Sequence, residues 1–403
     1  MNTDRIAITG MGAVTPIGIG VGNYLRALAD GVCGIDEISL IDTGDLPVHR
    51  AAQVHGFEPR NYLSSRLSND LDRFMQFAYI AAEEALKDAG IETGDERTGI
   101  VMATALAGVA LTGETARKLA LSGAPVGPRF VSQIMGNIAA AQLAIAHHIT
   151  GPSLNVSTAC SSGGDAILTS CMFIRAGMAD TVVVMAGEAP VSPLTIASLA
   201  RARALSKTGE SLPFDTLRNG FVMGEGGGAL ILESETHALR RGARIHGFVA
   251  GCANTEDAFH VVSPEPNGLG AAACMRLALQ QAGLTPSDIG YINAHGTATH
   301  AGDTAEAKAI KAVFENTRVP VSSTKGMTGH MMAAGGITET IACVNALESG
   351  IIPANIGCTQ IDSECDLNIQ LSVRPADDLR YSMSNAFGFG GQNSCIIVGK
   401  YEA

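Results

Sequence analysis

Apolar runs of strand length alternate with segments of helical period along the chain. The runs at 6–14, 98–105, 180–189 and 227–233 are mostly apolar and predict buried β-strands. RFMQFAYIAAEEALKDAG at 73–90 has apolar positions at helical spacing and ends in a glycine, which predicts a helix with a glycine C-cap. This alternation is typical of an α/β protein.

Part of this pattern occurs twice. ALKDAGI at 85–91 precedes a strand and is matched by ALQQAGL at 278–284, which also precedes one. LNVSTACSSGGDAI at 154–167 is matched by VPVSSTKGMTGHMMAAGG at 319–336. In each member of the second pair, a β-branched strand leads into Ser-Thr, a sharp turn and a helix rich in small residues. Two matches in the same order indicate a duplicated fold.

The duplication predicts how the chain is organised. We expect one compact body made of an N-terminal half at 1–245 and a C-terminal half at 246–403, joined around RRGARIHGF. Chance similarity between short segments rich in glycine and alanine is the alternative, and it stays open at this point.

Composition restricts the kinds of partner. The 403 residues are 46% hydrophobic and 16% charged, enough for a large interior and a buried subunit interface. A net charge of −12 disfavours nonspecific nucleic-acid binding. The nine cysteines form no CxxC pair, which is typical of reduced thiols in the cytoplasm. No N-terminal signal segment and no apolar run of about 18 residues is seen, so we expect no membrane span.

STACSSGGDAI at 157–167 is the strongest candidate for chemistry. Cys160 follows a strand and precedes a helix that opens with SSGG. A thiol at a helix N-terminus lies near free backbone N–H groups and the positive end of the helix dipole, which favours the thiolate. A buried structural cysteine is the alternative, but the strand–turn–helix setting favours a nucleophile.

Three further segments carry candidate residues. His295 leaves a buried strand and enters a Gly/Thr-rich loop, a position where α/β folds present side chains to ligands. Lys325 and His330 lie in the turn of the second repeat, and a lysine among small and apolar residues needs a carboxylate partner, for which we expect Glu306. SNAFGFGGQNS at 384–394 forms a glycine-rich turn able to carry an aromatic gate.

With these segments in order, the chain resembles the β-ketoacyl-acyl-carrier-protein synthases, condensing enzymes of the thiolase superfamily. The motifs TACSSG, HGTATHAGD, STKGMTGH and NAFGFGG carry the resemblance, and it is greatest to type II elongation synthases and related polyketide ketosynthases. It implies a thiolase-like duplicated βα fold layered α-β-α-β-α. It also implies decarboxylative condensation of an acyl-enzyme thioester with a malonyl thioester on acyl carrier protein.

The resemblance also implies a role for individual residues. Cys160 would be the nucleophile, His295 and His330 would hold the malonyl thioester carbonyl, and Lys325 with Glu306 would order the site. The remaining implied residues are Cys160 and Phe389 in the oxyanion hole, with Phe389 also as gate; Thr297 and Thr299 in the pantetheine channel; Leu106 and Leu199 in the acyl pocket; Phe387 as a further substrate-binding residue; and Asn293, Glu339, Ser384 and Asn385 around a structural monovalent cation.

Loss of carbon dioxide would drive the condensation, so we expect no redox or metal cofactor. The substrates would arrive on the phosphopantetheine of acyl carrier protein, docked at Arg66, Arg73 and Arg203. Asn69 and Asp70 dilute this basic patch, which suggests a specialised pathway with its own carrier. The resemblance further implies a dimer, formed with an identical chain or a related synthase subunit.

Two other functions stay in competition. A CoA-dependent thiolase needs a second cysteine in a CxG turn near the C-terminus, whereas Cys395 lies in an apparent strand. A catalytically weak partner subunit of the chain-length-factor kind keeps the fold but loses the nucleophile. The joint presence of Cys160, His295, His330 and Lys325 argues against that second possibility.

Overall fold

The computed structural model describes residues 4–315 and 317–402. Within them, twelve strands form one mixed sheet in the order β13–β11–β10–β15–β16–β9–β1–β8–β7–β5–β6, with β2 paired to β1 alone. These strands are β1 (Ile6–Thr15), β2 (Gly18–Ile19), β5 (Thr98–Ala103), β6 (Ser153–Val156), β7 (Thr181–Glu188), β8 (Gly226–Ser234), β9 (Gly247–Glu256), β10 (Ile289–Asn293), β11 (Pro320–Ser322), β13 (Asn368–Ile369), β15 (Tyr381–Gly388) and β16 (Gln392–Lys400). Two small pairs lie apart: β3 (Ile35–Glu37) with β4 (Arg50–Ala52), and β12 (Ile351–Ile352) with β14 (Arg374–Pro375).

The helices are α1 (Val21–Asp30), α2 (Ser65–Asp70), α3 (Arg73–Ala89), α4 (Val109–Ser122), α5 (Phe130–Ile134), α6 (Ile138–His147), α7 (Ser162–Arg175), α8 (Pro193–Arg201), α9 (Glu235–Arg240), α10 (Leu269–Ala282), α11 (His300–Phe314), α12 (Lys325–Thr328) and α13 (Ala333–Ser349). The predicted strands correspond to β1, β5, β7 and β8, and the predicted helix is α3, which ends at Gly90 in a left-handed C-cap. In the described part of the chain, every helix is too short or too polar to cross a bilayer.

The sheet contains the same strand pattern twice. One half runs β6–β5–β7–β8–β1 and the other β11–β10–β15–β16–β9. In both, the first two pairings are parallel and the last two antiparallel. β1 and β9 then join the two halves by antiparallel pairing. This symmetry confirms the predicted duplicated βα fold, while the domain division at residue 245 stays a prediction.

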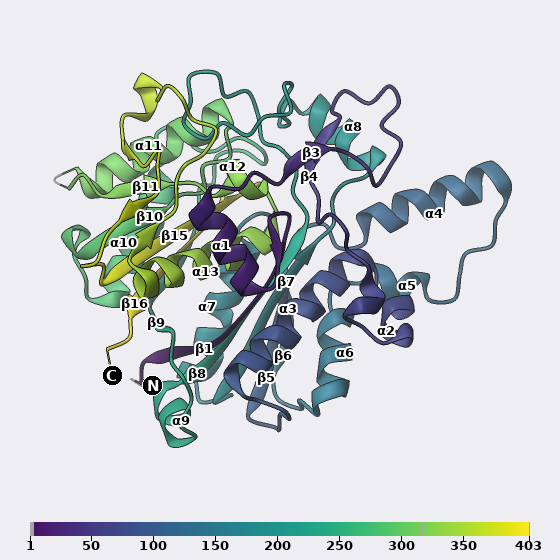
Figure 1. Cartoon of the computed structure of the whole chain (residues 1–403), viewed down its shortest axis with the longest axis horizontal. Helices are drawn as coiled ribbons and strands as arrows, with labels where there is room; N and C mark the ends of the chain where they lie inside the picture. Colours follow the sequence, from purple (N-terminus) through teal and green to yellow (C-terminus); the bar gives the residue numbers. More distant parts are fainter. Residues whose placement is uncertain (1–3, 316, 403) are drawn as a thin grey trace.

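The helices complete five layers (Figure 1). α3 and α6 cover the outer face of the first half-sheet, and α10 and α11 cover the outer face of the second. α7 and α13 lie between the half-sheets and contact strands of both. Each of the three helical layers has its own apolar cluster against the strands. Both faces of each half-sheet are therefore covered by helices.

The two central helices cross through glycine backbone. A Cβ added to Gly163 of α7 would overlap the carbonyl oxygen of Ala333, and a Cβ on Gly336 of α13 would lie 2.7 Å from the amide nitrogen of Gly164. Only glycine allows so close an approach. The small-residue segments matched in the sequence are therefore the surfaces by which the two halves touch.

A buried histidine adds a second tie between the halves. His246 Nε2 lies 2.8 Å from Asp88 Oδ2 on α3, and its Nδ1 lies 3.0 Å from Glu348 Oε1 on α13. Since carboxylates only accept, both ring nitrogens donate and the imidazole is a cation. Burial alone would lower the pKa of His246, but the hydrogen bonds and charges of Asp88 and Glu348 outweigh it and raise the pKa to about 9.

This pair of contacts predicts a pH-dependent contribution to stability. The folded pKa of His246 lies above the unfolded value of about 6.5, so its stabilisation is complete below about pH 6.5 and is lost as the pH rises through about 9. His246→Gln should lower the free energy of unfolding in urea by about 2 kcal/mol near pH 6, and the difference should shrink near pH 10. His49→Gln, at an exposed histidine, is the control. An equal loss at both pH values would contradict the assignment.

Candidate active site

The nucleophile turn connects β6 to α7. Ala159 has a left-handed φ of 49°, an unfavourable conformation for alanine that surrounding contacts must hold. The Ser161 hydroxyl donates to the Thr158 carbonyl oxygen at 2.7 Å. The Thr158 hydroxyl donates to Asp165 at 2.5 Å. The Ser161 hydroxyl shares its proton between the Thr158 carbonyl oxygen and Asp165, which lies 3.1 Å away. Cys160 is thus fixed at the apex of the predicted strand–turn–helix elbow.

Asp165 is a positioning residue that the sequence reasoning missed. It is buried in the first turn of α7, and its second oxygen accepts from Asn254 Nδ2 on β9 at 2.8 Å. The nucleophile turn is therefore held by both halves of the molecule. The sequence does contain a signal for this residue, because Asp165 is a carboxylate in the first turn of the helix that follows the cysteine.

Cys160, His295 and His330 meet in one buried pocket. His330 Nε2 lies 3.0 Å from Cys160 Sγ. The His295 and His330 rings are 5.2 Å apart between centroids and nearly perpendicular, and Phe221 meets the His330 ring edge-on at 5.1 Å. Met332 Sδ lies 4.0 Å from the nucleophile sulfur. Three segments far apart in the sequence therefore form one site. Phe221 and Met332 also contact it, and the sequence did not predict them.

Burial decides the protonation of this site. It lowers the pKa of both His295 and His330 well below the usual range, and the positive charge of Lys325 lowers both further. It raises the pKa of Cys160 to about 12, although Lys325 and the Phe389 N–H act in the opposite direction. Burial therefore opposes the expected thiolate in the free enzyme and favours a neutral thiol beside a neutral imidazole.

The expected Lys325–Glu306 pair is also wrong. The buried Lys325 ammonium is paired with Glu339 of α13. Glu306 instead accepts from the backbone N–H groups of His295, at 2.9 Å, and Gly296, at 2.7 Å. Glu306 thus orients the loop that carries His295. The sequence does not reveal which of two carboxylates faces the lysine, because α11 and α13 reach the site from different directions.

A tunnel leads from the surface to Cys160. Its lining includes Thr297, Thr299, Phe387 and Phe389, all expected in the substrate path. The Phe389 N–H is hydrogen-bonded to the Cys160 sulfur. A Cβ added to Gly388 would lie only 3.1 Å from the Cys160 amide nitrogen, so the glycine turn lies directly over the nucleophile. The predicted oxyanion-hole groups are thus adjacent to the sulfur.

The two leucines expected in the acyl pocket are placed differently. Cys160 belongs to an apolar cluster, and Leu199 and Ala105 pack against it. Leu106 is one residue beyond Ala105, partly exposed and outside that cluster. The buried carboxylate of Glu188 holds this turn by accepting from the Thr104 hydroxyl at 2.9 Å and from the Ala105 N–H.

The arginines expected to dock a carrier have different surroundings. Arg73 donates to the buried Glu225 at 2.8 and 2.5 Å and its guanidinium lies over two aromatic rings, which removes it from the docking set. Arg66 is exposed but lies 3.5 Å from Asp70. Arg203 lines the tunnel mouth.

The residues expected around a monovalent cation have unused polar atoms. In the described residues, no hydrogen-bond partner reaches Asn293 Nδ2 or Oδ1, Glu339 Oε2, or Asn385 Oδ1, all buried. Ser384 pairs with Asn293 across β10 and β15. Buried oxygens without a hydrogen-bond partner suit a bound cation, and the cation itself stays a prediction.

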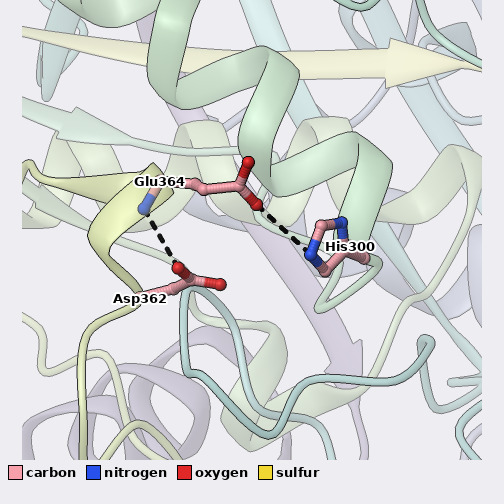
Figure 2. A group of neighbouring side chains, drawn as sticks. All are labelled: His300, Asp362 and Glu364. Carbon is pink, nitrogen blue, oxygen red and sulfur yellow. Dashed lines mark hydrogen bonds and ion pairs between the residues drawn. The ribbon is translucent and has the colours of Figure 1, made fainter.

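Figure 2 shows a further cluster, on the surface, that the sequence did not predict. His300 Nε2 lies 3.3 Å from Glu364 Oε2, and Asp362 accepts from the Glu364 N–H at 3.0 Å. Arg218 already supplies a positive charge to Asp362, at 2.5 Å. We assign no metal to this cluster.

Known proteins share this architecture over the whole chain. Residues 3–238 match the family "Beta-ketoacyl synthase, N-terminal domain" and residues 246–359 match "Beta-ketoacyl synthase, C-terminal domain". A 3-oxoacyl-[acyl-carrier-protein] synthase 2 of Staphylococcus aureus (strain N315) is 37% identical over 410 residues, covering 99% of each chain. The ishigamide ketosynthase/chain length factor has a TM-score of 0.94 at 32% identity, covering 99% of this chain and 100% of that one. A type II polyketide ketosynthase in complex with its acyl-carrier protein has a TM-score of 0.90 at 30% identity, with the same coverage. The chain therefore belongs to the β-ketoacyl synthase family and is a ketosynthase, an acyltransferase.

Proposed function

We propose that this ketosynthase elongates an acyl chain by decarboxylative condensation with malonyl-acyl-carrier protein. The observation that carries the proposal is the 3.0 Å contact between Cys160 Sγ and His330 Nε2. The His295 ring faces this contact inside a buried pocket that a tunnel reaches. A nucleophile and two imidazoles in one dry site fit acyl transfer followed by enolate formation.

In the first step the Cys160 sulfur attacks the carbonyl carbon of the carrier thioester. His330 accepts the thiol proton as the carbon–sulfur bond forms, which suits a neutral thiol beside a neutral imidazole. The N–H groups of Cys160 and Phe389 stabilise the oxyanion. The bond to the carrier sulfur then breaks, and the leaving thiolate takes the proton from His330.

In the second step the malonyl thioester loses carbon dioxide. The electrons of the broken carbon–carbon bond pass to the thioester enolate, whose oxygen accepts hydrogen bonds from an N–H of His295 and from His330. For this step the neutral His330 ring carries its one proton on Nε2, the tautomer opposite to the one that accepts the thiol proton. Each such donor is typically worth about 3 kcal/mol of barrier. Burial favours the neutral form of both imidazoles, and the positive charge of Lys325 lowers their pKa values further. The enolate carbon then attacks the carbonyl carbon of the acyl-cysteine, the bond to the Cys160 sulfur breaks, and the Cys160 thiolate takes a proton from water to restore the thiol.

This reaction needs no redox or metal cofactor, because loss of carbon dioxide drives it. A monovalent cation held by Asn293, Glu339, Ser384 and Asn385 would offset the buried negative charge of Glu339 and order the site, without taking part in a step. Burial raises the pKa of Glu339 to about 7, and the charge of Lys325 opposes this rise.

A second related subunit would complete the molecule. α4 projects from the body, and none of its residues, all of which the structure describes, is buried (Figure 1). β6 is the outer strand of the sheet in the described chain and exposes Leu154. Leu119, Leu121 and Val131 are exposed on α4 and α5. An open edge with apolar neighbours favours pairing with an identical chain or a related synthase subunit.

The other candidate functions have less support. Cys395 lies fully buried in β16, which does not suit the second cysteine of a thiolase. The Cys160–His330 contact supports an enzyme over a catalytically weak partner subunit. All nine cysteines are free thiols, which supports a cytoplasmic location.

Variants of two residues separate the two chemical steps. After incubation with an acyl thioester, intact-protein mass spectrometry should show an acyl adduct that Cys160→Ala abolishes and Cys33→Ala, at an exposed cysteine, retains. His330→Ala should still form some adduct but lose condensation by about a hundredfold or more, because one enolate donor is gone. An adduct in Cys160→Ala, or full condensation in His330→Ala, would contradict the mechanism.

The diluted basic patch predicts a preference among carriers. In a panel of malonyl and acyl carriers scored by product mass, kcat/KM on a carrier of a specialised pathway should exceed that on a fatty-acid carrier by about tenfold or more. Equal turnover on both would refute the dedicated carrier.

The exposed β6 edge predicts self-association or a partner. In analytical ultracentrifugation the chain should sediment as two chains, and Leu154→Arg should shift it towards one because a charge enters the apolar contact. Leu239→Arg, on the exposed face of α9, is the matched control. If the chain alone is monomeric, a related subunit should bind it and Leu154→Arg should prevent binding; no association in either case would reject the dimer.

A further inference from the structure

Five large apolar side chains lie on the segments 256–269 and 388–391, which both contribute residues to the tunnel lining. Phe259, Val261 and Leu269 are more than half exposed, at 56%, 72% and 65%, and Val262 and Phe389 are partly exposed. Val262 and Phe389 also line the tunnel itself. We call these five residues the apolar rim. Exposed apolar side chains gathered at one opening mark a contact surface.

Hydrogen bonds hold the two segments that carry the rim in a fixed arrangement. The Gly390 N–H donates to the Val261 carbonyl oxygen at 2.8 Å, and the Asp257 N–H donates to the Gly391 carbonyl oxygen at 2.8 Å. The Asp257 carboxylate accepts from the Glu265 N–H at 2.9 Å and from Asn393 Nδ2 at 2.8 Å. The segments at 256–269 and 388–391 are therefore joined side by side.

The acidic groups of the rim segments are used internally. Asp257 makes the contacts above, and Glu265 accepts from the Leu269 N–H at 2.8 Å and the Asn267 N–H at 3.0 Å. His260 Nδ1 accepts from the Val262 and Ser263 N–H groups at 3.0 and 3.1 Å. The rim thus presents mainly apolar side chains, with Arg203 at the mouth beside them.

Part of the basic surface that would attract an acidic carrier is paired with carboxylates of the same chain. Asp70 lies 3.5 Å from Arg66 and 2.9 Å from Arg129. Arg73 is bound to Glu225. The chain carries a net charge of −12, so the overall field repels an acidic partner. Charge steering is therefore weak on this enzyme, and another interaction must hold the carrier.

We propose that the carrier protein docks by apolar contact on the rim formed by Phe259, Val261, Val262, Leu269 and Phe389, and not on a basic patch. This inference rests on the proposed function, since a thioester arm that enters the tunnel holds its carrier against the mouth. The partner is a small carrier that presents apolar side chains around its prosthetic group. Apolar contact depends little on salt, unlike contact between opposite charges.

Kinetics with two kinds of substrate test the proposal. The probes are the carrier that supports the highest turnover in the panel above and an acyl-pantetheine thioester without a carrier. Phe259→Asp and Val261→Asp should each lower kcat/KM on the carrier substrate by about tenfold or more and change turnover of the small thioester by less than about twofold. On the unaltered enzyme, kcat/KM for the carrier should change by less than about twofold between about 50 and about 500 mM NaCl.

Two control variants make the outcome specific. Leu239→Asp places the same charge on an exposed leucine of α9, outside the rim, and should leave both activities unchanged. Arg66→Glu should lower carrier turnover by less than about threefold. A larger effect of Arg66→Glu than of Phe259→Asp, together with a steep fall with salt, would overturn apolar docking. Failure of the unaltered enzyme to use either substrate would overturn the proposed function itself.

Discussion

At the centre of the molecule α7 and α13 cross with Gly163 against Ala333 and Gly336 against Gly164. Helices that meet through side chains usually lie about 8–10 Å apart, and glycine backbone removes that spacer. Cys160 and His330 come just before these two helices, so the distance between the helix ends becomes the distance between the reacting atoms. The close crossing of the two helices brings the Cys160 sulfur and the His330 imidazole within 3.0 Å of each other.

The same crossing buries the site away from water, and this burial determines which of its groups are charged. Removal from water disfavours every isolated charge, so the thiol and both imidazoles stay neutral. The buried ammonium of Lys325 is paired with Glu339. Its charge makes protonation of the histidines still less favourable. In the free enzyme Cys160 and His330 are therefore a neutral pair. Negative charge develops only when the sulfur attacks a thioester, whose carbonyl oxygen accepts that charge.

Some charged groups on the surface are likewise paired within the chain, while Arg203 at the tunnel mouth is exposed. Arg73 supports the core through Glu225, and Asp70 lies between two further arginines. Side chains that could have attracted an acidic partner serve the fold instead. The apolar rim lies at the end of the strand pair β15–β16, where the glycine turn over Cys160 also forms part of the tunnel mouth. Docking and chemistry thus share one structural element.

The sequence by itself determined the four strands β1, β5, β7 and β8, the helix α3, the duplicated fold and the segments that carry Cys160, His295 and His330. These follow from local periodicity, from a repeat and from turns that differ little with context. Only the tertiary structure decided that Lys325 binds Glu339 and not Glu306, that Arg73 is engaged by Glu225, and that Cys160 is a thiol. Ion-pair choice and desolvation depend on distances between segments far apart in the chain, and no local pattern of residues contains those distances.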